Sequence, residues 1–198
     1  MQILIPTDRR LYDLGIWNGP LLQSDGLTLS GAHSIMRYLC DNYLPPSNTF
    51  YPRDDIKKRG IIDMMMDWHL TTLSFCNKQV EVKLLGEPAF LEKYKIFFLL
   101  PEQFPKEVHK SLKLLDTEFI DRGYFQSRST GPTIADIMIF NEIISLNQIN
   151  YPINKYPRIL SILQSMIDST PTVREVSRSV FANSINLGFQ PYFPEQKL

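Results

Sequence analysis

The chain has 198 residues, and its 21 lysines and arginines are balanced by 21 aspartates and glutamates, so the formal net charge is zero. This balance argues against nucleic acids and other polyphosphates as the main partners, because such partners need a basic excess. Hydrophobic residues make up 43% of the chain, which is typical of a globular protein. No apolar run reaches the ~20 residues that a membrane-spanning helix needs.

The first 44 residues predict a small unit that contains β-strands. Met1–Pro6 alternates weakly and has the pattern of one strand. Two short apolar stretches flank Asp25-Gly26, and Asp-Gly between such stretches favours a hairpin because the tight turn needs positive φ. After Ser30, apolar side chains recur at helical spacing over the next dozen residues. We therefore expect residues 1–44 to form strands, a hairpin and a helix.

The rest of the chain predicts a helical domain. Residues 45–53 begin with two prolines and predict a linker. From residue 54 to residue 186, apolar positions recur with helical spacing in about five segments. The stretch 133–146 is apolar on almost every side, so we expect it in the middle of a bundle. Residues 187–198 form an aromatic, proline-containing tail without periodicity, which is a candidate strap for docking to a partner.

Thr133 and Asp136 have the spacing of a helix capping box, with a hydroxyl at the N-cap and an acid three residues later. Two interpretations of Asp136 are open. The carboxylate is either a catalytic group or a buried cap that satisfies the first N–H groups of the helix. The spacing favours the cap, because the cap alone supplies a reason for the acid.

No pattern predicts a metal centre or an activated nucleophile. The three histidines, His33, His69 and His109, form neither an HExxH motif nor a cluster with cysteines. Cys40 and Cys76 are far apart and lack the CxxC form, so we expect buried cysteines in a reducing compartment. The phosphate-binding glycine loops and the GxSxG nucleophile elbow are also missing from the sequence.

The order of the motifs from about Leu14 to Val180 resembles the glutathione S-transferase family, in its theta-like branch. The motifs that carry the resemblance are Gly19-Pro20 to Leu39, Tyr51-Pro52, Asp67-Trp68-His69, Thr133-Ile134-Ala135-Asp136 and Tyr156-Pro157 to Val173. The resemblance implies an α+β, mostly helical fold. A truncated thioredoxin-like unit, residues 1–44, would precede an all-α glutathione-transferase C-terminal bundle, residues 54–186, and the family is usually dimeric.

The same resemblance places a glutathione site on four residues. In the family, the residue before a cis-proline pairs with the backbone of glutathione, which makes Gly19 and Pro20 a vestigial anchor. An acid and a hydroxyl of the family bind the γ-glutamyl end, and they fall on Gly31 and Ala32 here. Neither residue has a side-chain acceptor, and each lost charge-assisted bond is worth ~1.5–3 kcal/mol. We therefore expect a degenerate site with weak binding.

A catalytic residue is not expected. The family's catalytic tyrosine, serine or cysteine follows the first strand of a strand–helix–strand block, which needs ~30 residues or more. Only 18 residues precede Gly19-Pro20. Tyr12 would serve only in a heavily rearranged fold.

These observations predict a non-catalytic glutathione-transferase-like protein, a pseudoenzyme that acts as a structural or interaction subunit of a larger assembly. The alternative is an active theta-like transferase that conjugates glutathione to small electrophiles; a third interpretation is a truncated form of a longer chain.

No metal or cofactor is expected, except glutathione under the alternative, and the expected partner is another protein or a second copy of this chain. The N-terminus lacks a secretory signal pattern. We expect a soluble intracellular protein, cytoplasmic by default, with an organellar complex such as a mitochondrial one left open.

Overall fold

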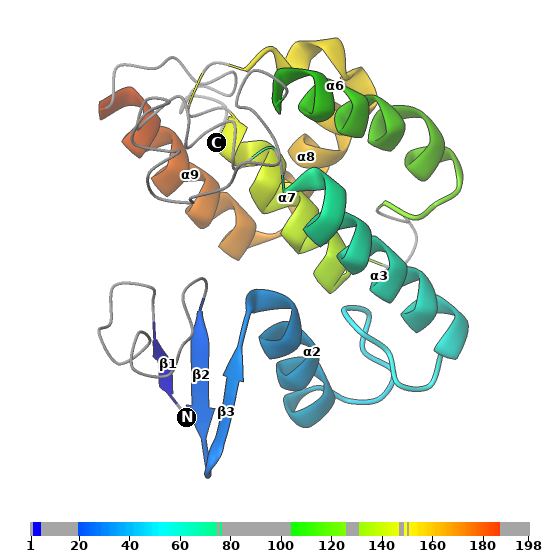
Figure 1. Ribbon diagram of the computed structural model, residues 1–198, viewed down its shortest axis with the longest axis vertical. Helices are drawn as coiled ribbons and strands as arrows, with labels where there is room; N and C mark the ends of the chain where they lie inside the picture. Colours follow the sequence, from blue (N-terminus) through cyan, green and yellow to red (C-terminus); the bar gives the residue numbers. More distant parts are fainter. Residues whose placement is uncertain are drawn as a thin grey trace. The chain divides into compact units, whose positions relative to one another are not determined.

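The computed structural model describes residues 2–4, 20–74, 76, 104–125, 131–146, 149 and 151–186. Contacts divide the chain into two compact units, Met1–Ile62 and Asp63–Leu198, and each is described on its own. The first unit holds a sheet and a helix, and the second is helical (Figure 1). The predicted α+β class, with most of the described residues in helices, is therefore confirmed.

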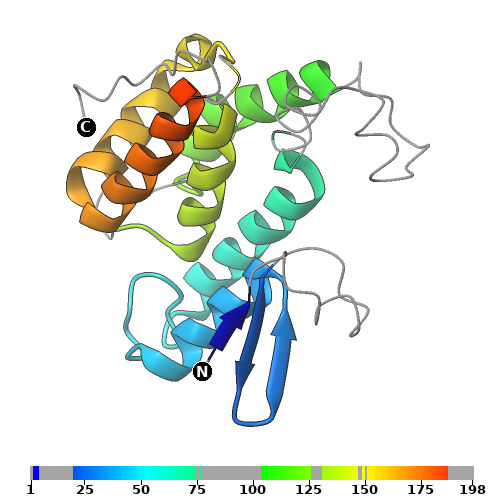
Figure 2. The ribbon, with the colours of Figure 1, turned by 90° about the vertical axis from the view of Figure 1, so that its left-hand side faces the viewer.

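The sheet of the first unit has three short strands in the order β1-β2-β3, and both pairs are antiparallel. The strands are β1 (Gln2–Leu4), β2 (Leu21–Ser24) and β3 (Leu27–Ser30). The predicted hairpin is confirmed, because Asp25 and Gly26 adopt φ values of 49° and 83° at a two-residue turn. Figure 2 shows the three strands side by side. The central strand β2 buries both Leu21 and Leu22, whose side chains point to opposite faces of the sheet.

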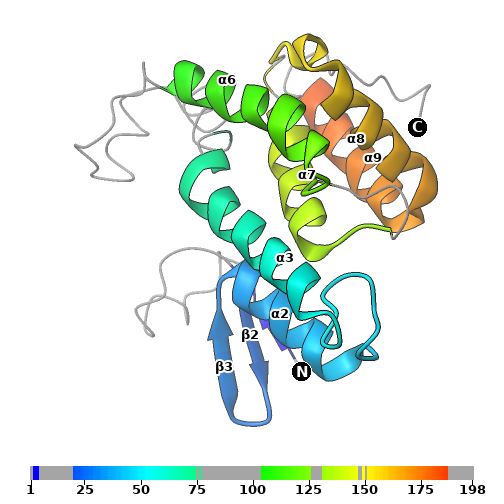
Figure 3. The ribbon, with the colours of Figure 1, turned by 90° about the vertical axis from the view of Figure 1, so that its right-hand side faces the viewer.

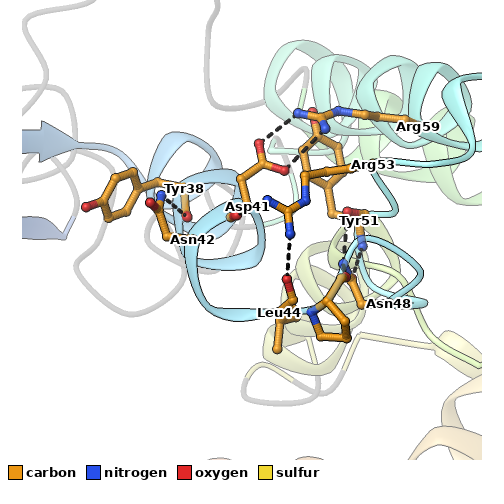
Figure 4. A network of polar contacts seen from close by, with 9 residues as sticks. Tyr38, Asp41, Asn42, Leu44, Asn48, Tyr51, Arg53 and Arg59 are labelled. Carbon is orange, nitrogen blue, oxygen red and sulfur yellow. Dashed lines mark hydrogen bonds and ion pairs between the residues drawn. The ribbon is translucent and has the colours of Figure 1, made fainter.

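Helix α2 (Ala32–Tyr43) packs against the sheet, and a network of side-chain bonds closes its C-terminal end (Figure 4). The guanidinium of Arg53 donates to the carbonyl oxygens of Asp41 at 2.6 Å and Leu44 at 2.9 Å. A cation at this end also complements the helix dipole. Asn48 accepts a bond from the Tyr51 N–H at 2.8 Å and donates to Pro45. The chain that follows α2 is thus held by its own side chains.

The predicted linker 45–53 leads into α3 (Ile56–Trp68), whose first turns belong to the first unit. Arg59 makes a two-pronged ion pair with Asp41 at 3.2 and 2.8 Å, and it lies 4.1 Å above the ring of Tyr51. These bonds explain why the contacts divide the chain at Ile62 and not at the prolines. The predicted domain boundary at the linker stays a prediction.

The second unit is a bundle of helices around α7. Its elements after α3 are η1 (His69–Leu73), α6 (Phe104–Leu114), η3 (Leu115–Phe119), α7 (Ile134–Leu146), η5 (Ile153–Lys155), α8 (Pro157–Ser169) and α9 (Pro171–Asn186). Helix α7 packs against both η1 and α9, and Figure 3 shows it with α8 and α9 in the helical unit. Its side chains are buried on nearly every side. The predicted central position of the apolar stretch 133–146 is confirmed. None of the helices among the described residues combines the length and the apolar character needed to cross a bilayer.

The start of α8 is capped from another element. Pro157 occupies the first position of the helix, where its missing N–H is no loss. Asp116 in η3 accepts hydrogen bonds from the N–H groups of Arg158 at 3.1 Å and Ile159 at 2.9 Å. Arg158 also pairs through its guanidinium with Asp121 and holds the pKa of that carboxyl below its usual range. The carboxylate of Asp116 therefore ties η3 to α8.

Candidate functional site

The N-terminus of α2 is the place to which the sequence assigns the glutathione site. Strand β3 ends at Ser30, and Gly31 then turns the chain into the helix with φ 85°. This φ lies in the region that favours glycine. The Gly31 N–H donates to the carbonyl of Pro20 at 3.1 Å, so the hairpin brings Pro20 beside the start of α2. Gly19 and its bond to Pro20 lie outside the described residues.

The chemistry of this helix start is limited by its side chains. Gly31 forms no side-chain cap, and the first turn of α2 contains no acidic residue. A Cβ atom added to Gly31 would have no atom within 4 Å, so the space for a longer side chain is open. Helix N–H groups with their partial positive charge favour a carboxylate here. Neither Gly31 nor Ala32 carries a group that binds an ammonium.

Thr133 and Asp136 form the hydrogen bonds of a capping box at the start of α7. The Asp136 carboxylate accepts from the Thr133 N–H at 2.7 Å and from the Thr133 hydroxyl at 2.8 Å. In return, the Asp136 N–H donates to the hydroxyl of Thr133 at 3.2 Å. Asp136 is only 1% exposed. This geometry supports the cap interpretation over the catalytic one, because the carboxylate is both engaged and enclosed.

A buried contact between a histidine and a carboxylate, which the sequence did not predict, lies inside the helical unit. The Nε2 atom of His69 in η1 is 3.3 Å from Oε1 of Glu142 in α7, and both side chains are almost fully enclosed. The signal in the sequence is a second acid of the apolar stretch 133–146, Glu142, which the capping box does not explain, together with a histidine on an apolar helix face. Charged residues at such positions are rarely buried unless they are paired.

Cys76 is buried near this pair and is a poor nucleophile. Burial, followed by the charge of Glu142, raises the pKa of its thiol well above the ordinary value. Because the thiolate is the reactive form, this environment suppresses its chemistry. Burial also raises the pKa of the Cys40 thiol. Within the described part of the chain, no group of three or more His, Cys, Asp or Glu side chains is arranged to hold a metal ion.

Comparisons with known proteins agree on the fold. No family model matches the sequence. A diazinon-metabolizing glutathione S-transferase from the silkworm, Bombyx mori, is 23% identical with a TM-score of 0.69, over 88% of this chain and 77% of that one. A delta-class glutathione transferase from Nilaparvata lugens is 23% identical with a TM-score of 0.68, over 88% and 76%. The apo form of human glutathione-S-transferase T1-1 is 20% identical with a TM-score of 0.68, over 96% and 78%.

These similarities confirm the resemblance predicted from the motif order. The neighbours are glutathione S-transferases of several classes, and this chain, with its small sheet unit and its helical bundle, has their fold. At identities of 20 to 23%, the likeness establishes the fold. The chemistry has to be argued from the residues of this chain.

Proposed function

We propose that this chain, whose fold is that of the glutathione S-transferases, is a non-catalytic member of that fold and serves as a structural or interaction subunit of a protein assembly. The observation that carries the proposal is the start of α2, where Gly31 and Ala32 stand in place of an acid and a hydroxyl. A transferase must hold glutathione before it can activate the thiol. The proposal therefore depends on how much binding this replacement removes.

The loss can be estimated from the bonds that are missing. Each charge-assisted hydrogen bond contributes ~1.5–3 kcal/mol, so the loss of two weakens binding by about 3–6 kcal/mol, or roughly two to four orders of magnitude. The helix dipole of α2 still favours an anion, but this contribution is only ~0.3–1 kcal/mol. A dissociation constant of about 1 μM would thus become one of roughly 0.1–10 mM.

Exposed apolar side chains on α3 support an interaction role. Ile61 and Met64 lie three residues apart on the helix and are 37% and 43% exposed. Neighbouring large apolar side chains that stay exposed on one helix are typical of protein contacts.

Calorimetric titration of the full chain with glutathione tests the proposal. We expect no saturation below about 0.1 mM, and a low-micromolar dissociation constant would overturn the proposal. The variant Ala32→Ser restores the missing hydroxyl and should bind more tightly than the natural chain. Gly31→Glu with Ala32→Ser restores the acid as well and should bind more tightly still, although the φ of 85° at position 31 strains a side chain there and lowers the stability of this variant. Gly60→Glu adds the same charge at an exposed position of α3 and should leave the binding unchanged.

Two further measurements separate the proposal from an active transferase. We expect no conjugation of glutathione to an aryl halide, even at high protein concentration, and robust turnover would contradict the proposal. Light scattering of the purified chain should show association or poor solubility in the absence of a partner. A stable, soluble monomer would argue against an obligate protein partner.

A further inference from the structure

Helix α3 is shared by the two compact units of the chain. Its residues up to Ile62 belong to the sheet unit, and those from Asp63 onward belong to the helical unit. The division falls inside a helix, so a continuous helical backbone joins the two units. Whether this helix is a stiff rod or a joint that bends depends on how its successive turns are held.

The N-terminal part of α3 is held by polar contacts within the sheet unit. The guanidinium of Arg59 pairs with the two carboxylate oxygens of Asp41 in α2 and lies 4.1 Å above the ring of Tyr51 (Figure 4). The carboxylate of Asp55 accepts a hydrogen bond from the N–H of Lys58 at 2.9 Å and so caps the first turn. The helix up to Arg59 is therefore tied to the sheet unit.

The C-terminal part of α3 is held by apolar packing within the helical unit. The side chains of Met65 and Met66 are fully buried. The ring of Trp68 packs edge-on against Phe119 in η3, with 4.8 Å between the ring centroids. Directly after Trp68, η1 packs against both α6 and α7. The helix from Met65 onward is therefore tied to the helical unit.

Gly60 lies between these two parts of α3, and the local structure does not require a glycine there. Its backbone is helical, unlike the positive φ of Gly31 at the start of α2. A Cβ atom at Gly60 would meet no atom within 4 Å, and the next residue, Ile61, is 37% exposed. Glycine weakens a helix interior because its backbone loses the most conformational freedom on folding. The turn at Gly60 is thus the weak turn of α3, and alanine would fit in its place.

From this arrangement we propose that α3 bends at Gly60 and acts as a hinge between the sheet unit and the helical unit. A hinge consists of a few residues that absorb changes in φ and ψ between two parts that are each held firmly. The hydrogen bonds around Gly60 open, while the ion pair of Arg59 and the burial of Met65 stay in place. The joint lets the orientation of the two units change when a partner binds one of them. This inference does not depend on the loss of glutathione binding.

Amide hydrogen exchange of the full chain, measured by NMR for single residues, tests the opening of the helix. In a helix, the N–H groups of the four residues after Gly60 bond to carbonyls of the preceding turn, so these bonds cross the hinge. We expect the amides of Ile61 to Met64 to exchange faster than that of Met66. Gly60→Ala should slow their exchange by roughly two- to fivefold, which is the difference between the two residues in a helix interior. The control Lys57→Ala changes another exposed position of α3, keeps the glycine, and should have little effect.

Residual dipolar couplings of the same samples distinguish a hinge from local opening alone. A chain that behaves as one rigid body gives the same degree of alignment for both units, whereas a hinge gives two different degrees. We expect two degrees for the natural chain and a smaller difference between them in Gly60→Ala.

The proposal is overturned if both units of the natural chain align to the same degree, or if Gly60→Ala and Lys57→Ala behave alike. Gly60 could instead leave room for the close approach of a second molecule. In that case Gly60→Ala would change the mass measured by light scattering without slowing the exchange, and this result would also overturn the hinge.

Discussion

Replacement of Asp116 by alanine should destabilise the helical unit. Asp116 lies in η3, but its carboxylate caps the start of another helix, α8. The variant removes the acceptor of two N–H groups, those of Arg158 and Ile159 in α8. Tyr156 at the N-cap offers no side-chain cap in its place. Each net hydrogen bond is worth ~0.5–1.5 kcal/mol, and a carboxylate at a helix N-terminus adds ~0.3–1 kcal/mol. Because Asp116 is partly exposed and water can replace it, we expect a loss of about 2 kcal/mol.

Urea unfolding followed by the fluorescence of Trp68 measures this loss. The ring of Trp68 packs edge-on against Phe119 at 4.8 Å, in the same π-helical turn as Asp116, and a Trp17→Phe background removes the other indole. The urea concentration at the midpoint of unfolding should fall, while the slope of the free energy of unfolding against urea concentration stays the same. Asp121→Ala is the matched control, because it removes only an exposed contact with the side chain of Arg158. Equal shifts in the two variants would refute the reasoning.

Three further results are expected. Arg59→Lys removes the two-pronged pair with Asp41 and should lower the free energy of unfolding by up to about 1 kcal/mol, measured in urea. Glu142→Ala removes the buried carboxylate beside His69 and should cost about 3 kcal/mol, whereas leucine at both positions should recover most of that loss. Failure of the double variant to recover would contradict a pairwise contact between the two side chains. Stability should fall as pH rises above ~8.5, the pKa of an unfolded thiol, because the folded chain keeps Cys76 protonated. In a Cys76→Ala variant, the free energy of unfolding should decrease less steeply between pH ~8.5 and ~10. If its dependence on pH is unchanged, other groups cause the decrease.

Features that depend on neighbouring residues could be predicted from the sequence. The hairpin follows from Asp25-Gly26 because the turn geometry restricts the residues that fit it. The start of α7 follows from Thr133 and Asp136 because the capping bonds join residues three apart. The order of the motifs resembles that of the glutathione S-transferases, and this resemblance extends the local predictions to the whole fold. In each case the physical constraint lies within a few residues.

Features that depend on distant contacts could not be predicted in this way. The proline segment 45–53 has the composition of a free linker, yet Arg53 reaches back to the end of α2. The pair of His69 and Glu142 joins positions that are brought together only by the packing of η1 on α7. The hydrogen bond between His109 and Tyr156 likewise joins residues from distant parts of the sequence. Composition and periodicity contain no information about such pairs.

The capping box of α7 has a consequence for the order in which the helical unit folds. Its bonds close a loop of three residues, which costs little chain entropy, whereas the contacts of α7 with η1 and α9 require much longer loops to close. Helix α7 can therefore be structured in the folding transition state before its neighbours pack on it. A Thr133→Ala variant should slow folding more than it speeds unfolding, and stopped-flow kinetics would reveal this as a φ-value well above those of side chains in α9.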